Sequence, residues 1–157
     1  DVAYAVGMLC RCMARPSASV FACACRVLRY LYRTRHLGLR FAASDKKLFG
    51  MSDADWSVKH STMGYIFQLH SAAVSWSSKK QASVSLSTCE AEIMAASEGA
   101  KEAVHLSALA EELGAHDGSA IDLHVDNKSA IDLAYNPEHH QAVKHIARRH
   151  FCFTYSF

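Results

Sequence analysis

The stretch STCEAEIMAASEGAKEAVHLSALAEEL, residues 87–113, decides the fold of this chain because it predicts one long helix. Ser87 and Glu90 fit a capping box, in which the serine side chain and a glutamate three residues later each satisfy a free backbone amide. Gly114 follows directly, and glycine is favoured just beyond a helix end. We therefore predict a helix from Ser87 to Leu113.

Segments with strand character precede this helix. KLFGMSD (47–53) is a plausible strand that ends in an acid. Two runs rich in β-branched and aromatic residues follow, TMGYIFQLH (62–70) and AAVSWSS (72–78), separated by a very short turn near Ser71. These runs predict a β-hairpin, whereas VSLS (84–87) fits either a short strand or an entry loop.

After the long helix the chain returns to a strand and then to helices. IDLHVD (121–126) alternates as a strand, and NKSAIDLAY (127–135) is helical until Pro137 stops it. One more helix is expected over 142–153. This order of strands and helices predicts an α/β fold, with a mixed sheet flanked by helices.

The first part of the chain is helical throughout. Residues 3–14 predict a helix that ends before Pro16, and a second helix, capped by Ser17 or Ser19, runs to about Thr34.

The second of these helices is amphipathic and basic. Its apolar residues recur at helical spacing, and arginines lie on or beside the other face. That face is either simply solvated or contacts the phosphates of a nucleic acid, with Arg29 and Arg33 as candidate contacts.

Composition restricts the classes of function. Seventeen lysines and arginines nearly balance 15 acids, and half the residues are apolar, as in soluble globular proteins. The longest apolar stretches fall far short of the roughly 20 residues of a membrane helix, so no membrane partner is expected. The first residues make a poor signal peptide, and the missing initiator Met suggests a fragment.

Two Cys-x-Cys pairs, at 10 and 12 and at 23 and 25, suggest a zinc-binding interaction module. Both pairs fall in helical segments, however, where residues two apart point in different directions. We expect idle or buried thiols, whose spacing without a disulfide framework fits a reducing compartment.

Three acids sit where predicted elements change, namely Asp53 at a strand end, Glu92 in the first turns of the long helix, and Asp126 at a strand-to-helix junction. Each has a structural alternative, because Asp53 would start a turn, Glu92 would favour the helix dipole and Asp126 would cap a helix. If the two strands are parallel neighbours, both aspartates emerge at the same sheet edge. Asp55, with the strand parity of Asp53, is a rival ligand.

Three carboxylates at one place would repel one another, and divalent cations would relieve the repulsion. Carboxylates and water are the ligands that Mg²⁺ prefers, and Mn²⁺ is a common substitute. Two such ions about 4 Å apart activate the attacking water and stabilise the leaving oxygen in phosphodiester cleavage. The acids therefore predict Mg²⁺-dependent phosphodiester chemistry.

Four segments, in order, resemble the Pol polyprotein of copia-type LTR retrotransposons, and together they cover most of residues 47–151. They are SDADWSVKHSTMGYIF (52–67), VSWSSKKQASVSLSTCEAEIMAASEGAKEAVHL (74–106), HVDNKSAIDLAYNP (124–137) and VKHIARRHF (143–151). Residues 1–42, with DVAYAVGMLCRCMARPS and RVLRYLYRTRHLGL, are similar to the stretch between polymerase core and nuclease.

The resemblance implies that residues 1–45 are a helical connection from the end of a reverse transcriptase and that residues 46–157 are a ribonuclease H-like domain. Such a domain cuts the RNA strand of an RNA–DNA hybrid. By position, Asp53, Glu92 and Asp126 become the metal ligands and catalytic residues, with Mg²⁺ as cofactor. The implied partners are the hybrid and the rest of the Pol polyprotein, in cytoplasmic virus-like particles or in the nucleus.

Lys79 and Lys80 are placed for contacts with phosphates, which would recognise the shape of a hybrid rather than its sequence. A solvated loop is the alternative for both lysines. The large aromatic residues Trp56, Tyr65 and Trp76 are expected in the core, as most aromatics in or beside strands are.

The sequence departs from the family in two places. Ala147 stands where the family usually carries an acid, and the resemblance implies a fourth carboxylate beyond Phe157. These departures predict a truncated copy with impaired activity. The alternative function is a non-catalytic nucleic-acid-binding remnant of a retrotransposon.

Overall fold

The chain divides into two compact units, Asp1–Arg40 and Phe41–Phe157. The structure, a computed structural model, describes residues 1–42, 47–57, 61–115 and 119–135. The helix expected over 142–153 and the position of Ala147 lie outside the described residues. None of the described helices is long and apolar enough to cross a membrane.

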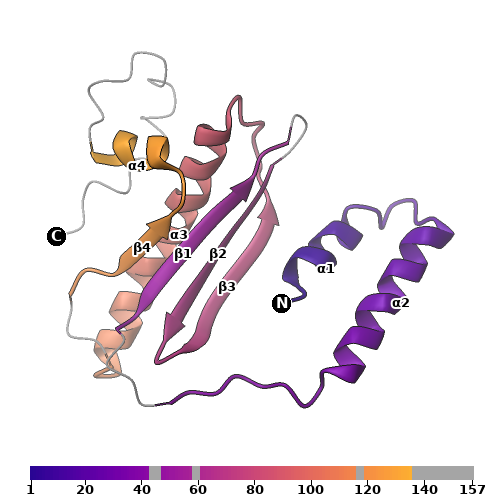
Figure 1. Cartoon of the computed structure of the whole chain (residues 1–157), viewed down its shortest axis with the longest axis horizontal. Coiled ribbons are helices and arrows are strands. Elements are labelled where there is room, and N and C mark those ends of the chain that lie inside the picture. Colours follow the sequence, from indigo (N-terminus) through magenta and orange to yellow (C-terminus); the bar gives the residue numbers. More distant parts are fainter. Residues whose placement is uncertain (43–46, 58–60, 116–118, 136–157) are drawn as a thin grey trace. The chain divides into compact units, whose positions relative to one another are not determined.

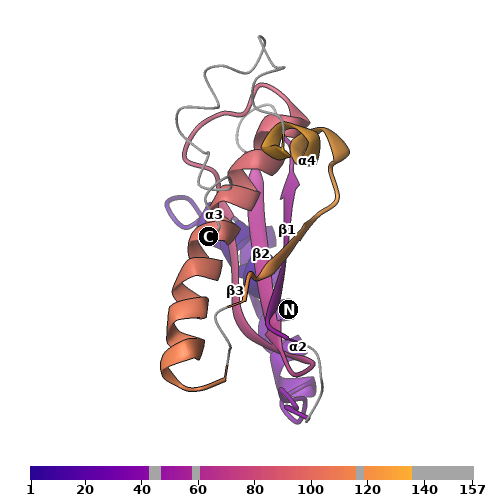
Figure 2. The ribbon, with the colours of Figure 1, turned by 90° about the vertical axis from the view of Figure 1, so that its left-hand side faces the viewer.

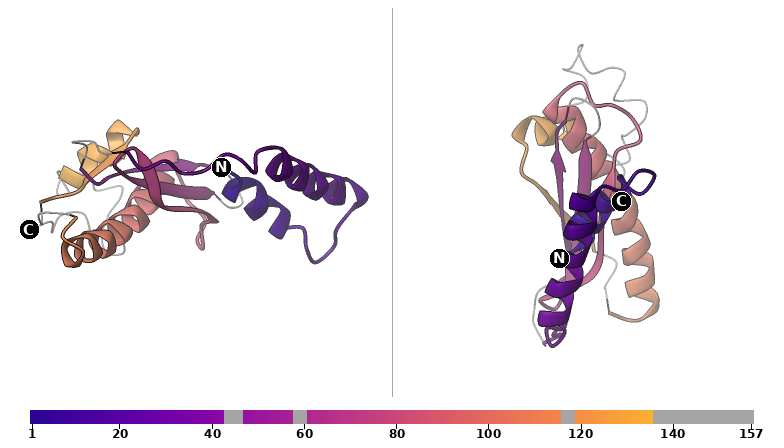
Figure 3. Two further views of the ribbon diagram at one scale, coloured as in Figure 1. Left: turned by 90° about the horizontal axis from the view of Figure 1, so that it is seen from below. Right: turned by 90° about the vertical axis from the view of Figure 1, so that its right-hand side faces the viewer.

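The first unit holds two helices, α1 (Ala3–Cys10) and α2 (Ala18–Arg33), which lie side by side (Figure 3). Helix α1 is shorter than the predicted 3–14, because the chain beyond Cys10 continues in turns closed by bonds between residues three apart. Helix α2 follows the prediction closely. Its cap is Ser17, whose side chain accepts a hydrogen bond from the amide of Val20 at 3.3 Å.

The second unit is an α/β structure with one four-stranded mixed sheet, which confirms the predicted fold class at that level (Figure 1). In space the strands follow the order β3-β2-β1-β4. Both contacts between β1, β2 and β3 are antiparallel, and β4 is parallel to β1. The elements are β1 (Phe49–Asp55), β2 (Thr62–Leu69), β3 (Ala72–Lys80), α3 (Thr88–Glu112), β4 (Asp122–Val125) and α4 (Lys128–Tyr135).

Strands β2 and β3 form the predicted hairpin. Its two turn residues, His70 and Ser71, both have positive φ, at 49° and 72°. Positive φ at both central residues matches the right-handed twist of paired strands and permits this two-residue connection. Residues 84–87 form no strand, so of the two possibilities raised for VSLS the entry loop is correct.

Helix α3 runs along one face of the sheet (Figure 2). Its first half is buried throughout residues 91–97, whereas most of its second half is accessible to solvent. At Gly99 the helix lies close to the sheet, since a Cβ built there would be 3.3 Å from the methyl groups of Leu123 in β4. Ile93 of α3 packs against Ala130 of α4, so both ends of the β4–α4 segment rest on this helix.

The prediction that the large aromatics lie in the core is wrong for both tryptophans. Trp56 is 41% exposed and Trp76 is 54% exposed. Ser75 faces α3, because its hydroxyl is hydrogen-bonded to Glu102 of that helix. Neighbouring residues of a strand point to opposite faces, so Trp76 lies on the face of edge strand β3 that α3 does not cover. Tyr65 is half-buried, and burial, followed by the nearby Glu102, raises the pKa of its hydroxyl.

Candidate metal centre

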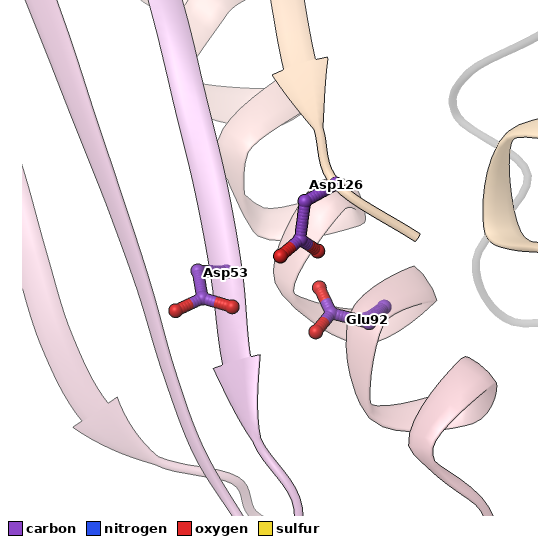
Figure 4. A group of neighbouring side chains, drawn as sticks. All are labelled: Asp53, Glu92 and Asp126. Carbon is purple, nitrogen blue, oxygen red and sulfur yellow. The ribbon is translucent and has the colours of Figure 1, made fainter. Parts of the chain in front are cut away.

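Three acidic side chains converge at the end of the sheet where β1 and β4 finish. Asp53 lies on β1, Glu92 in the first turns of α3, and Asp126 directly after β4. The parallel pairing of β1 with β4, in which Ser52 is opposite Val125, brings the two aspartates to the same edge. Figure 4 shows the three carboxylates pointing toward one another from these three elements.

The three carboxylates are close enough to bind one cation together. One oxygen from each of Asp53, Glu92 and Asp126 lies within 4.8 Å of the other two. Glu92 is buried, whereas both aspartates are exposed, so the cluster is anchored in the protein and open to solvent on one side. Among the residues that the structure describes, no cysteine belongs to such a group, which leaves the zinc-module hypothesis without a ligand set there.

The surroundings of Glu92 change the pKa of its carboxyl group. Its side chain accepts a hydrogen bond from the backbone amide of Ala54 at 3.3 Å, which fixes one carboxylate oxygen against β1. Burial, with a smaller contribution from the charges of Asp53 and Asp126, raises the pKa of Glu92 to about 7, although the Ala54 hydrogen bond acts in the opposite direction. The site therefore disfavours a third negative charge when no cation is bound.

The second carboxylate oxygen of Glu92 is placed to bind a cation. Oε2 is buried and has no hydrogen-bond partner among the described residues. A buried, unpaired carboxylate oxygen facing two further carboxylates is the donor set expected for a hard divalent cation such as Mg²⁺ or Mn²⁺. The residues present therefore fit the predicted cofactor.

Neighbouring residues, not Asp126 and Glu92, make the side-chain contacts that cap the starts of α4 and α3. Asn127, not Asp126, caps α4, because its side-chain oxygen accepts a hydrogen bond from the amide of Ala130 at 3.0 Å. Glu90 serves the start of α3, where its carboxylate accepts from the amide of Leu86 at 2.6 Å and Ser87 accepts from the amide of Glu90. Asp126 and Glu92 are thereby left available to the cluster.

The pKa of Glu92 predicts how stability depends on pH when chelator removes divalent cations. A folded pKa of about 7, above the usual 4.5, means that protonated Glu92 contributes stability that is fully present below pH 4.5. This contribution is lost as the pH rises through 7, and we expect a loss of about 1–2 kcal/mol. Urea unfolding at pH 5 and pH 8 in EDTA measures it.

The control for this prediction is Glu92→Gln, which has nearly the same shape and no titrating proton. The difference in unfolding free energy between pH 5 and pH 8 should shrink in that variant. Equal differences in the variant and the original chain would contradict the assignment of the pH dependence to Glu92.

The basic residues singled out in the sequence lie in different surroundings. Lys79 forms an ion pair with Glu98 of α3 at 3.0 Å, and Lys101 binds the other oxygen of the same carboxylate at 2.6 Å. Lys80 is exposed at the end of β3. It pairs with Thr62 of β2, and Thr62 in turn pairs with Asp55 of β1. Lys80 thus lies at the acidic end of the sheet, about 10 Å from β1 across two strand spacings.

Arg29 and Arg33 are exposed on α2 in the first unit. The structure therefore joins the three acids into one site of the second unit, whereas the two arginines belong to the first unit.

The second unit is therefore an α/β unit with a candidate divalent-cation site, formed by acids clustered at one edge of its sheet. Comparison with known proteins gives the family. The chain is 39% identical to the retrovirus-related Pol polyprotein from transposon TNT 1-94 of Nicotiana tabacum, over 96% of this chain and 12% of that protein. It is 36% identical to the Pol polyprotein from transposon RE1 of Arabidopsis thaliana, over 94% of this chain and 10% of that protein.

A shorter relative is the secreted RxLR effector protein 161 of Plasmopara viticola, which is 46% identical over 68% of this chain and 79% of that protein. Over nearly its whole length the chain is homologous to a stretch of copia-type retrotransposon Pol polyproteins, and it is a retrotransposon-derived sequence. It spans about a tenth of the length of the Pol polyproteins it matches. No family model and no solved structure matches it.

Proposed function

We propose that the second unit is the ribonuclease H region of a retrotransposon Pol polyprotein and hydrolyses the RNA strand of RNA–DNA hybrids with Mg²⁺ or Mn²⁺. The observation that carries the proposal is the convergence of Asp53, Glu92 and Asp126 within 4.8 Å at one sheet edge. Homology to Pol polyproteins supports a role in the nucleic-acid chemistry of a retrotransposon.

The three acids would divide the work of holding the cations. Glu92 supplies a fixed, buried oxygen, because the amide of Ala54 orients its carboxylate. Asp53 and Asp126 are exposed, and they leave the open side of the site accessible to a phosphodiester. Bound divalent cations would supply an activated water and stabilise the leaving oxygen of the RNA strand.

The surroundings of the cluster suit a double-stranded substrate better than a single nucleotide. Lys80 is exposed at the same end of the sheet as the acids, where its ammonium group would meet a phosphate of the nucleic-acid backbone. Contacts of this kind position a duplex without reading its bases. Recognition would therefore depend on the shape of the hybrid, in which one strand carries 2′-hydroxyl groups.

Cleavage of an end-labelled RNA–DNA hybrid tests the proposal directly. We expect Mg²⁺- or Mn²⁺-dependent cutting of the RNA strand, blocked by EDTA, with no cutting of the DNA strand. Single-stranded RNA and an RNA–RNA duplex of the same sequence are the matched substrates and should remain intact. Absence of cutting by folded chain at millimolar Mn²⁺ would sink the enzymatic proposal.

A second candidate function is binding of nucleic acid without cleavage. The observation that favours it is the exposure of Arg29 and Arg33 on one basic helix, in a unit that does not contain the acids. Retention of the intact hybrid, weakened strongly by salt and by replacement of both arginines, would support this candidate.

A further inference from the structure

We propose that Gln81 is a positioning residue that holds Glu92 at the acidic cluster through the backbone of Ala91. The contacts that carry this inference exist without any cation, and only its meaning for catalysis rests on the proposed function. Gln81 directly follows β3, and it is 1% exposed, which is unusual for a glutamine.

The side chain of Gln81 spans two segments of the fold. Its Nε2 donates a hydrogen bond to the carbonyl oxygen of Ala91 at 2.9 Å, and Ala91 is the residue before Glu92. Its Oε1 accepts a hydrogen bond from the hydroxyl of Ser85 at 2.6 Å. A buried amide with both ends bonded has a single favourable orientation, so it fixes the first turn of α3 relative to the end of β3.

The backbone around Gln81 continues the connection toward β1. The amide of Gln81 donates to the carbonyl of Ser61 at 2.8 Å, and the hydroxyl of Ser61 accepts from the amide of Ser57 at 3.2 Å. The indole of Trp56 donates to the carbonyl of Ser85 at 3.1 Å. The segment that follows Asp53 and the helix that carries Glu92 are thus bonded to the same buried glutamine and its neighbours.

Glu92 needs such a restraint because its contact with β1 is weak. That contact is one backbone hydrogen bond of 3.3 Å from the amide of Ala54. A small rotation of the first turn of α3 would move Glu92 toward solvent and break that bond. The bond from Gln81 to the carbonyl of Ala91 opposes the rotation at the adjacent residue.

The amide of Ala54 provides a readout that needs neither metal nor substrate. We would record its ¹H–¹⁵N signal and its hydrogen exchange in EDTA for Gln81→Met together with Ser85→Ala. Removing both hydrogen-bonding partners leaves an apolar pair, which keeps most of the stability. The matched control is Ser85→Ala alone, which keeps the bond between Gln81 and Ala91.

We expect the double variant to shift the Ala54 signal in the direction seen with Glu92→Ala and to speed its exchange at least about threefold. The Ser85→Ala control should leave the Ala54 signal in place. Gln81→Met alone should repeat the shift of the double variant despite its lower stability. An unchanged Ala54 signal in a folded double variant, or an equal shift in the control, would overturn the proposal.

Binding of Mn²⁺, measured from the free ion by electron paramagnetic resonance, separates this inference from the proposed function. We expect about tenfold weaker binding in the double variant than in the original chain, the low end for residues outside the ligand set. If the original chain binds no Mn²⁺ but the Ala54 signal responds as described, the proposed function fails and the positioning role stands. If Mn²⁺ binds equally to both and the Ala54 signal is unchanged, only the positioning role fails.

Discussion

Asp126→Asn is expected to lower cleavage of an RNA–DNA hybrid at least about 100-fold, because loss of one anionic ligand removes several kcal/mol of transition-state stabilisation. Asparagine preserves the size of the side chain and one oxygen, so the loss would reflect charge rather than shape. Asp126 is exposed and does not cap α4, so the fold should remain intact. Initial rates at saturating Mg²⁺, with circular dichroism of the same samples, measure both effects.

Asp55→Asn is the matched control for this experiment. Asp55 is an exposed aspartate on the same strand as Asp53 and shares its strand parity, but it does not belong to the cluster of three acids. Its replacement should change the cleavage rate by no more than about twofold. A large loss in Asp55→Asn together with a small loss in Asp126→Asn would show that the cation ligands have been assigned wrongly.

Gly50→Ala is expected to destabilise the second unit by about 1–3 kcal/mol, a typical cost of overpacking a core. Gly50 on β1 pairs with Phe67 on β2, whose side chain is completely buried. A Cβ at position 50 would lie 2.7 Å from Cζ and 2.8 Å from Cδ1 of the Phe67 ring, closer than carbon atoms normally approach. Urea unfolding of the variant and the original chain gives the difference in free energy.

Two further variants show whether the collision with the ring is the cause. Gly50→Ala combined with Phe67→Leu should be less destabilised than the sum of the single changes, since the smaller side chain makes room for the methyl group. Gly99→Ala adds a methyl group 3.3 Å from the movable methyl groups of Leu123 and gains helix propensity, so it should stay within about 1 kcal/mol of the original chain. Additive effects at positions 50 and 67 would argue against the steric explanation.

Much of the fold could be predicted because local signals agree with the tertiary structure. The long helix 87–113 has its cap in the sequence, and the structure places α3 at Thr88–Glu112 with Ser87 as the cap. The hairpin follows from two strand-like runs with a very short turn between them. The proximity of Asp53 and Asp126 could be predicted as well, because parallel strands deliver their last residues to one edge.

Other features depend on contacts that no local pattern contains. The exposure of Trp56 and Trp76 follows from which face of the sheet α3 covers, and that is a property of the assembled layers. Lys79 is next to Lys80 in the sequence, but only the fold brings Glu98 to it. No pattern in the sequence predicts the burial of Gln81, because its role depends on the carbonyl and hydroxyl groups that the fold brings to its side chain.

The order of the strands in space also bears on how the second unit folds. Strands β1, β2 and β3 are consecutive and antiparallel, so they associate through contacts between residues near in sequence, whereas β4 joins β1 only after α3 has crossed the sheet. Contacts between residues distant in sequence form slowly, because chain entropy is lost before they contribute. We therefore expect β4 to dock late and to bring Asp126 against the other two carboxylates in the same event. A divalent cation that bound at the proposed site would then favour this last docking step of folding, before any substrate is present.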